Sequence, residues 1–292
     1  MDIKFYHSIF DWMKTCQKYF DQDEPLFQLL ITNGSYLMEH HEEKAFFGIG
    51  TSHLNIQIIF MYRPPYNLVV HPFKDICEND MMMFAKSIFS KEPQIPGINA
   101  PEMFAKSFSE CFSHISRRNY TPHLQMDIMV IKSLKPVILP IVTCRLAQQS
   151  DLSFMNQWTI EFSEEALHET PDLSTVNEKN LERIAKKQCY LILDEQNNPR
   201  AMGLLTRPMK KGIAMTLVYT EKKSRGLGFG IAVAHYLSKI AFEMGYHYVS
   251  LYVDKSNPIS NRVYRKVGFN VIMDQSDYRF SWFYWQFNHS DV

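Results

Sequence analysis

Basic side chains and glycines gather between residues 222 and 230, and their types and spacing suit the binding of a phosphate group. They are Lys222, Lys223, Arg225, Gly226, Gly228 and Gly230. Glycine has no Cβ atom, so the backbone amides around it can approach a ligand closely. A helix that starts here would add free N–H groups and the positive end of its dipole. We therefore expect an anion site, with phosphate as the anion.

A strand and a helix flank this segment. Ile213 to Tyr219 is an apolar and β-branched run, which predicts a strand. From Gly228 to Met244 nearly every residue is apolar or small, which is typical of a helix that is covered on most sides. Gly245 then ends the helix. The basic loop thus joins the end of a strand to the start of a buried helix.

Two well-known phosphate loops fit this segment poorly. The loop of nucleotide triphosphatases ends in Gly-Lys-Ser/Thr, and no such ending follows Gly226 or Gly228. A dinucleotide fold could use Asp254, at the end of the next strand, to bind a ribose. Its G-x-G-x-x-G fingerprint fails because Ile231 stands in the place of the third glycine. Thr220 to Ser224 also separate the strand from Arg225, whereas that fold turns tightly into its first glycine.

The remaining pattern, Arg225-x-x-Gly228-x-Gly230, resembles the pyrophosphate loop of the GNAT N-acetyltransferase superfamily, which has the form Arg/Gln-x-x-Gly-x-Gly/Ala. The likeness continues in Asn257, in Tyr264 seven positions later and in the pair Gly268-Phe269. The segment VYT before the loop and the segment Asn-Pro-x-Ser-Asn before the tyrosine look like a bacterial branch of predicted acetyltransferases, some with an added N-terminal domain. The resemblance covers about residues 136 to 292.

The resemblance implies an α/β (α+β) fold for residues 136–292: a splayed, mixed, mostly antiparallel sheet of seven strands, flanked by helices. Further strands are expected at Pro140–Arg145, Tyr190–Leu193, Ala201–Thr206, Phe269–Met273 and Tyr278–Phe287. Further helices are expected at Asp151–Thr170 and Asn177–Lys187, and a short one around Tyr264. The turn Gln196-Asn197-Asn198-Pro199 predicts a hairpin between two of these strands.

Residues 1–135 are expected to form a smaller α/β domain, because 292 residues exceed what one compact core usually serves. Helices are expected at Ile3–Phe20, Pro25–Glu39, Asp80–Phe89 and Pro101–Ile115, and strands at Ala45–Ile49, Asn55–Tyr62, Leu68–His71 and Asp127–Ile131. The boundary is expected near Lys135-Pro136. The order of elements suggests a degenerate GNAT-like lobe, and an unrelated α/β cap is the alternative. In such a lobe the coenzyme loop would fall at Pro93–Pro101, which lacks the motif, so its coenzyme site looks lost.

The resemblance also implies roles for the matching residues. Amides of Leu217, Val218 and Thr220 would hold the acetyl carbonyl and the pantetheine arm of acetyl-CoA. The residues that would bind its pyrophosphate are Arg225, Gly226, Leu227, Gly228, Phe229 and Gly230. Asn257 would hydrogen-bond the coenzyme arm, and Tyr264 would lie near the sulfur and protonate the departing thiolate.

The activity implied is that of an acetyl-CoA-dependent N-acetyltransferase, which transfers the acetyl group directly to a primary amine of a small molecule rather than a protein. The alternative is an acyl-CoA sensor or scaffold that transfers nothing. A pure binder would need the loop but not a phenol at the sulfur, so Tyr264 favours the enzyme.

The general base and the acceptor stay open. The strand IAMTLVY offers no carboxylate or histidine. A base could come from Glu161, Glu164, Glu165 or His168, or from water, or it is not needed if the amine arrives neutral. The acidic residues Asp151, Glu161, Glu164, Glu165, Glu169 and Asp172 crowd the segment that borders the acceptor in the family. They would attract a cationic amine, although such charge runs usually only face water.

Composition argues against several other classes of protein. The 31 basic and 31 acidic residues balance, which does not favour nucleic acid as a partner. The five cysteines form no C-x-x-C pair and the histidines no H-E-x-x-H pattern, so we expect no metal site and no disulfide framework. The start Met-Asp-Ile-Lys lacks a signal-peptide core, and no apolar stretch is long enough to cross a membrane. We expect a cytoplasmic protein, and a homodimer stays open.

Overall fold

Residues 1–282 are described in the computed structural model, and they divide into two compact units. The first unit contains Met1–Gln125 and the described residues from Asp274 onward, and the second contains Met126–Met273. Strand β6 (Arg118–Ile131) begins in the first unit and ends in the second. Strand β12 (Asn270–Trp282) begins in the second unit and ends in the first. Because these two strands belong to both units, the division differs from the expected single boundary near Lys135-Pro136.

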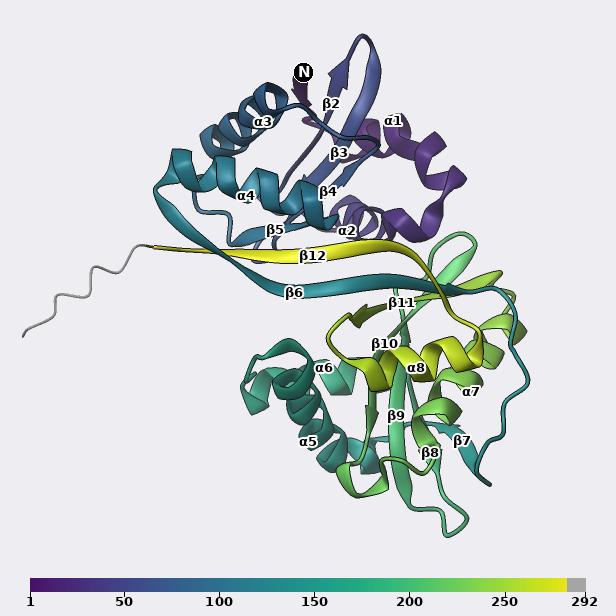
Figure 1. Cartoon of the computed structure of the whole chain (residues 1–292). Coiled ribbons are helices and arrows are strands. Elements are labelled where there is room, and N and C mark those ends of the chain that lie inside the picture. The colour runs from purple at the N-terminus through teal and green to yellow at the C-terminus, as the bar shows by residue number, and fades with distance from the viewer. Residues whose placement is uncertain (283–292) are drawn as a thin grey trace, which may run out of the picture. The chain divides into compact units, whose positions relative to one another are not determined.

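The first unit is built on a sheet with the strand order β1-β2-β3-β4-β5-β12-β6 (Figure 1). Its other strands are β1 (Asp2–Phe5), β2 (Phe46–Ser52), β3 (Asn55–Tyr62), β4 (Leu68–Pro72) and β5 (Gly97–Ala100). Its helices are α1 (Ile9–Gln22), α2 (Gln28–Glu39), α3 (Glu78–Lys91) and α4 (Glu102–Ser116). Strands β4 and β5 pair in parallel at Leu68↔Ile98 and Val69↔Asn99.

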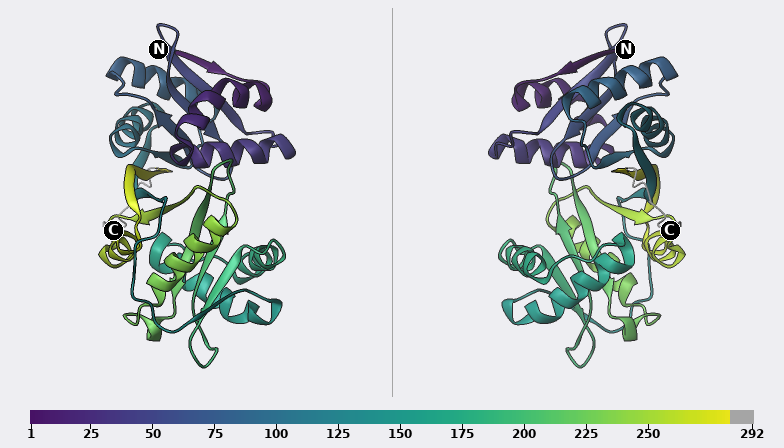
Figure 2. Two further views of the ribbon diagram at one scale, coloured as in Figure 1. Left: turned by 90° about the vertical axis from the view of Figure 1, so that its right-hand side faces the viewer. Right: turned by 90° about the vertical axis from the view of Figure 1, so that its left-hand side faces the viewer.

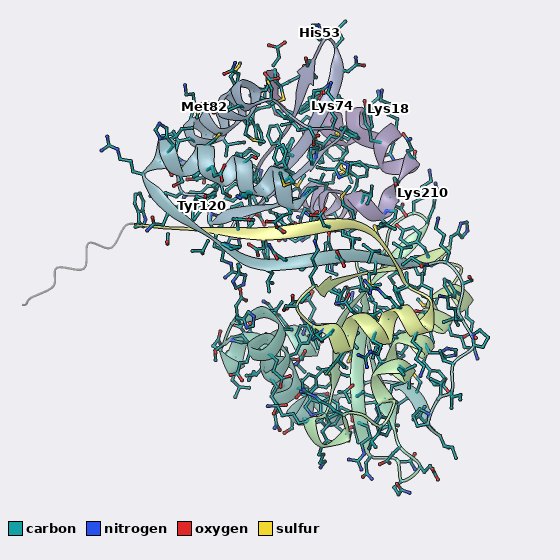
Figure 3. All side chains as sticks on the ribbon, in the orientation of Figure 1. Lys18, His53, Lys74, Met82, Tyr120 and Lys210 are labelled. Carbon is teal, nitrogen blue, oxygen red and sulfur yellow. The ribbon has the colours of Figure 1, made fainter. Side chains whose placement is uncertain are left out.

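Both faces of this sheet are covered by helices (Figures 1 and 2). In β3, Ile58 and Phe60 pack with α3 and α4, while Ile59 and Met61 pack with α1 and α2. Side chains alternate between the faces of a strand, so a strand buried on both sides is a continuous apolar run. The hairpin that joins β2 to β3 turns through the left-handed residue His53, labelled in Figure 3.

The second unit has the strand order β6-β11-β10-β9-β8-β7. Its other strands are β7 (Thr143–Leu146), β8 (Cys189–Leu193), β9 (Pro199–Thr206), β10 (Gly212–Thr220) and β11 (Tyr248–Asp254). Its helices are α5 (Leu152–Phe162), α6 (Leu173–Ala185), α7 (Phe229–Glu243) and α8 (Pro258–Val267). Strands β10 and β11 are parallel and stay in register only from Gly212↔Tyr248 to Ala214↔Ser250. The other paired strands of this unit are antiparallel. This confirms the expected α/β fold with a splayed, mixed, mostly antiparallel sheet.

Helices cover this sheet on both faces as well (Figure 2). Val233 and Leu237 of α7 pack with Leu205 and Val249, on the same side as α8. On the other face, Trp158 of α5 packs with sheet residues of β8 to β10. The segment between β10 and α7 is therefore held by a strand on one side and by a buried helix on the other.

The two units repeat one order of elements: a strand, two helices, three strands, a helix, a strand, a helix and a strand. The last strand of each repeat pairs with a strand of the other repeat. Strand β12 pairs with β5 in the first unit, from Ser276↔Ala100 to Arg279↔Gly97. Strand β6 pairs with β11 in the second unit, from Val249↔Ile131 to Asp254↔Met126.

Three sequence-based expectations were wrong. The helix expected at Ile3–Phe20 is preceded by strand β1, because Ser8 caps α1 and accepts a hydrogen bond from the Asp11 amide at 3.2 Å. Pro93–Pro101 is not the segment that corresponds to the coenzyme loop, because it contains the buried strand β5, whereas by element order that segment lies between β4 and α3. The two strands expected at Phe269–Met273 and Tyr278–Phe287 are one strand, β12, and residues 283–287 lie outside the described residues.

Candidate functional site

Strand β10 carries a bulge halfway along its length. Its register with β9 shifts between Thr216 and Tyr219, so that Leu217 and Val218 lie opposite the single residue Gly203. Leu217 has a φ of 49°, in the left-handed region that a leucine rarely adopts. Backbone strain of this kind persists where the surrounding structure enforces it and is common at ligand sites. The bulge interrupts the regular pairing at Leu217 and Val218, two of the expected amide donors, while Thr220 lies in register with Ala201.

The loop after β10 leaves a run of backbone amides free. A 3-10 turn at Lys222–Ser224 leads to Arg225, and α7 begins at Phe229. Within residues 1–282, no protein group accepts a hydrogen bond from the amides of residues 226 to 230. Free amides at the start of a 15-residue helix form a site for an anion.

Two of the loop glycines are required by the backbone. Gly226 and Gly228 have φ values of 79° and 89°. A Cβ atom at Gly228 would also lie 3.2 Å from the Cδ atom of Pro140. The chain thus fits the diphosphate of a coenzyme here, because the glycines keep side chains away from the free amides.

The loop cations contact an acidic residue from the segment after α5. The Arg225 Nη2 atom donates to the Glu165 Oε2 atom at 2.7 Å, and the Lys222 Nζ atom lies 3.4 Å from Glu165 Oε1. The Arg225 Nε atom donates to the Thr220 carbonyl at 3.2 Å. The expected diphosphate-binding arginine is therefore held at the loop by a carboxylate and by β10.

Tyr264 lies on α8, and its side chain is buried in the core on the α7 side of the sheet. Its ring meets that of Phe269 edge to face, with centroids 5.6 Å apart. Burial raises the pKa of the phenol, so the hydroxyl keeps its proton. Gly268, with a φ of 128°, ends α8, and the amides of Gly268 and Phe269 donate to the Tyr264 carbonyl at 3.1 and 3.0 Å. Tyr264, Gly268 and Phe269 together thus fix the end of this helix.

Asn257 caps the start of α8. Its Oδ1 atom accepts a hydrogen bond from the Ser260 amide at 3.0 Å, which leaves its NH2 group as a donor on the same side chain. Sequence reasoning missed Asn261, whose Nδ2 atom donates to the Asp254 carbonyl at 2.8 Å and to the Asn257 carbonyl at 2.9 Å. Its spacing of four from Asn257 was the available signal, because residues four apart share one side of a helix.

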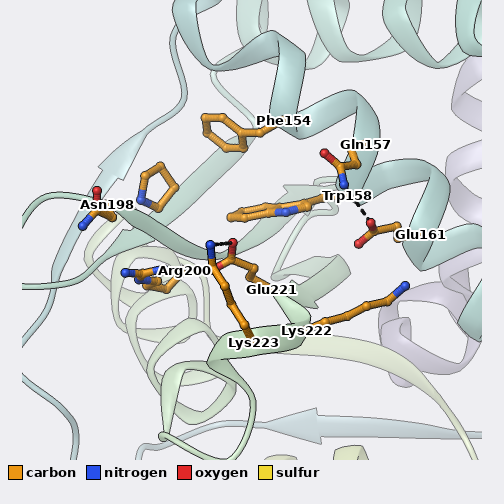
Figure 4. A pocket seen from close by; sticks show the side chains of 10 residues that line it. Phe154, Gln157, Trp158, Glu161, Asn198, Arg200, Glu221, Lys222 and Lys223 are labelled. Atoms are coloured by element: carbon orange, nitrogen blue, oxygen red, sulfur yellow. Dashed lines mark hydrogen bonds and ion pairs between the residues drawn. The ribbon is translucent and has the colours of Figure 1, made fainter.

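A pocket of about 540 Å³ lies between α5, the start of β9 and the residues after β10 (Figure 4). Glu161 at its edge accepts hydrogen bonds from the Tyr219 hydroxyl and, at 2.9 Å, from Gln157 Nε2. These bonds, the one from Tyr219 foremost, lower the pKa of the Glu161 carboxyl. Such a carboxylate is a weak base. Of the proposed bases, Glu161 is therefore poorly suited and Glu165 is occupied by the loop cations.

Several acids of this region have structural roles. Arg145 binds Asp151 through two hydrogen bonds of 2.6 and 2.9 Å. Asp172 caps α6 by accepting from the Thr175 amide at 2.9 Å. The structure thus gives several of these acids partners of their own, which weakens the argument for an acidic surface that attracts amines.

Two further properties hold for the described part of the chain. Residues 1–282 contain no group of three or more His, Cys, Asp or Glu side chains placed to hold a metal ion. Over the same residues, every helix is too short or too polar to cross a membrane.

Comparison with known proteins identifies the family of one part of the chain. Residues 152–269 match the model of the acetyltransferase (GNAT) family. The chain therefore contains a GNAT acetyltransferase domain, as the resemblance in its sequence implied. A search of curated protein sequences found no match.

Solved structures share the fold over most of the chain. A GCN5-related N-acetyltransferase from Sphaerobacter thermophilus is 16% identical, with 80% of this chain and 79% of that chain covered and a TM-score of 0.55. A GNAT acetyltransferase from Colwellia psychrerythraea is 12% identical, with 97% and 100% covered and a TM-score of 0.58. A Drosophila protein is 11% identical, with 96% and 98% covered and a TM-score of 0.64.

Proposed function

We propose that this protein is an N-acetyltransferase that uses acetyl-CoA and acetylates a primary amine of a small molecule. The observation that carries the proposal is the run of free amides at residues 226 to 230, at the start of α7 and directly after the bulged strand β10. The GNAT domain at residues 152–269 supports the acetyl group as the one transferred.

Bound acetyl-CoA supplies a thioester whose C–S bond breaks as the amine nitrogen forms the new C–N bond, so the thiolate gains one proton and the nitrogen loses one. The loop amides and Arg225 would bind the diphosphate. The amides of Leu217, Val218 and Thr220 and the NH2 group of Asn257 would orient the arm. Tyr264 would give its proton, or a hydrogen bond, to the sulfur.

The proposal assigns no side chain as the general base, because Glu161 and Glu165 already have partners. Glu161 is hydrogen-bonded by Tyr219, and Glu165 by Arg225. We therefore propose that the amine reacts in its neutral form or gives its proton to water.

A valine at position 228 tests the coenzyme site. Gly228→Val would place a branched side chain at a left-handed position against Pro140 and in front of the amides. We expect the affinity for coenzyme A, measured by calorimetry, to fall by roughly 100-fold or more, since several charge-assisted hydrogen bonds are lost.

The matched control is Gly245→Val, because Gly245 is also left-handed, with a φ of 92°, and follows the other end of the same helix. Its coenzyme affinity should equal that of the parent. Unchanged affinity in Gly228→Val would contradict the site. Thiol release with a panel of amines separates the enzyme from a sensor, which would bind coenzyme A and release no thiol with any amine.

A further inference from the structure

Arg207, which directly follows β9, finds no hydrogen-bond acceptor in the described part of the chain. Within residues 1–282 it makes no hydrogen bond and no ion pair, and its guanidinium only faces the ring of Tyr252, 5.9 Å from the centroid. It has a φ of 50°, in the left-handed region. A guanidinium carries five N–H donors, and leaving them unused when it is partly buried is costly.

Three other arginines around this sheet differ in this respect. Arg145 binds Asp151, Arg200 binds Asp194 and Glu221, and Arg225 binds Glu165. Each of these cations has a carboxylate partner from the chain itself. Arg207 is thus a cation whose counter-ion the described chain does not supply.

The strand register places this arginine at the splay of the sheet. Thr206, next to Arg207, pairs with Ala214 of β10, and Ala214 is in the last parallel pair with Ser250 of β11. Beyond that pair the two strands diverge, and Tyr252 lies two residues further along β11. The pair of Arg207 and Tyr252 therefore lies where the gap between β10 and β11 opens.

The pair lies on the face of the sheet opposite α7. Leu251 and Val253 pack in the core under α7 and α8, so Tyr252, between them, faces the other way. On that face the hydroxyls of Thr206 and Thr216 lie 3.1 Å apart. The surface beside the splay is thus polar and carries the positive charge of Arg207.

Burial shifts the pKa values of both side chains of the pair. Burial lowers the pKa of Arg207 and raises the pKa of Tyr252 to about 12. Both groups keep their protons near neutral pH, so the surface is a fixed cation beside a neutral phenol. An anion that enters here would restore the interactions that the guanidinium lost when it left water.

We propose that Arg207 and Tyr252 bind a carboxylate of the acceptor, so that the acceptor is an amino acid or a similar amine. The inference rests on the proposed transferase function. A guanidinium fork binds the two oxygens of a carboxylate with two parallel hydrogen bonds. A single cation balances the single charge of a carboxylate, whereas a phosphate dianion would need a second cation.

The test uses acceptors in matched pairs: glycine with glycinamide, phenylalanine with phenethylamine, and β-alanine with O-phosphoethanolamine. Thiol release from acetyl-CoA gives kcat/KM for each. The parent protein should prefer the carboxylate member of each pair by about 10- to 100-fold, as expected for charge-assisted hydrogen bonds.

Arg207→Gln should abolish this preference, with little change in the rate for glycinamide and phenethylamine and none in the KM for acetyl-CoA. Arg207→Lys, which keeps the charge but not the fork, should fall between them. Arg262→Gln is the control, because Arg262 is exposed on α8, and it should behave as the parent. Thermal unfolding verifies that each variant folds.

A binding measurement gives a readout that needs no turnover. Glycine should raise the melting temperature of the protein saturated with coenzyme A more than glycinamide does, and Arg207→Gln should remove the difference. The inference would be overturned if glycine and glycinamide raised the melting temperature equally. It would also be overturned if Arg207→Gln lowered kcat/KM equally for both members of an acceptor pair, or if the parent used O-phosphoethanolamine better than β-alanine. If the parent protein does not bind coenzyme A, or releases no thiol with any of the amines, the result would instead count against the proposed function.

Discussion

Tyr264 shows how packing sets the chemistry of a single side chain. The phenol is buried beside Phe269, and burial raises its pKa above the ordinary value of a tyrosine. The sign follows from desolvation, which disfavours the charged phenolate and keeps the proton on the oxygen. Tyr264 therefore keeps a proton that it can donate to a leaving thiolate near neutral pH.

Tyr264→Phe tests this role. Phenylalanine keeps the ring and its packing but has no proton to give, so we expect kcat to fall by about 100-fold, in the usual range for a lost general acid. Coenzyme affinity should change little. The measurement is kcat by thiol release together with calorimetry on the same preparation. Parent-like turnover would show that the acid role is wrong, while the coenzyme site could still be right.

The raised pKa of Tyr264 also predicts a pH profile of activity. A tyrosine with a raised pKa does not titrate between pH 6 and 10, so any loss of activity in that range in the parent should persist unchanged in Tyr264→Phe. A limb of the profile that disappears in the variant would contradict the assigned pKa direction.

At the scale of the element, the start of α8 combines a cap with a proposed ligand contact. The Oδ1 atom of Asn257 caps the helix through Ser260, and its NH2 group would face the coenzyme arm. One side chain can serve both roles because an amide carries an acceptor and a donor.

Two substitutions at this position separate the roles. Asn257→Ala removes both, and the loss of the cap should cost about 1 kcal/mol of stability. Asn257→Ser keeps a capping oxygen and replaces the NH2 group by a shorter hydroxyl, so it should melt like the parent but bind coenzyme A less tightly. Thermal unfolding and calorimetry measure the two effects. Equal coenzyme affinity in Asn257→Ser and the parent would argue against the contact.

How far the sequence predicts an element depends on how local its causes are. The loop, the hairpin before β9 and the helix α7 were predicted because glycines, turn residues and apolar periodicity act within the segment. The bulge at Leu217 was not predicted, because a leucine carries no local signal for a φ of 49°. That conformation is imposed by the pairing of β9 with both sides of the bulge.

Strands β5 and β12 show the same limit. The polar run from Asp274 to Asp277 suggested a break between two strands, yet its side chains are satisfied by residues far away in the sequence. Gln275 Nε2 donates to Asn99 Oδ1 at 2.6 Å, and Asp274 Oδ2 accepts from the Glu102 amide at 2.9 Å. A local sequence pattern cannot predict hydrogen-bond partners that are more than 170 positions away.

For the molecule as a whole, we propose that the first unit is a GNAT-like lobe without a coenzyme site. Its order of elements repeats that of the second unit. Its helix α3 corresponds to α7, but has Glu78 and Asp80 in its first turn. No glycine occurs between β4 and α3. Acidic side chains at a helix start satisfy its dipole and oppose a phosphate.

The exchanged strands predict how a fragment behaves. A fragment of residues 136–292 would lack β6, whose residues from Met126 to Ile131 pair with β11. The edge of β11 would be exposed, and such edges promote aggregation. We expect this fragment to be poorly soluble and to lose coenzyme binding, as measured by size-exclusion chromatography, circular dichroism and calorimetry beside the full chain. A monomeric, cooperatively folded fragment with parent-like affinity would refute this.

The place of β12 beside β5 has a consequence during protein synthesis. The strand that pairs with β5 comes after the whole of the second unit, so the ribosome must translate more than 170 further residues before Ser276 can reach Ala100. At typical rates of translation this takes on the order of ten seconds. For that interval the nascent first unit has an open edge at β5, and its folding can finish only once the end of the chain has left the exit tunnel.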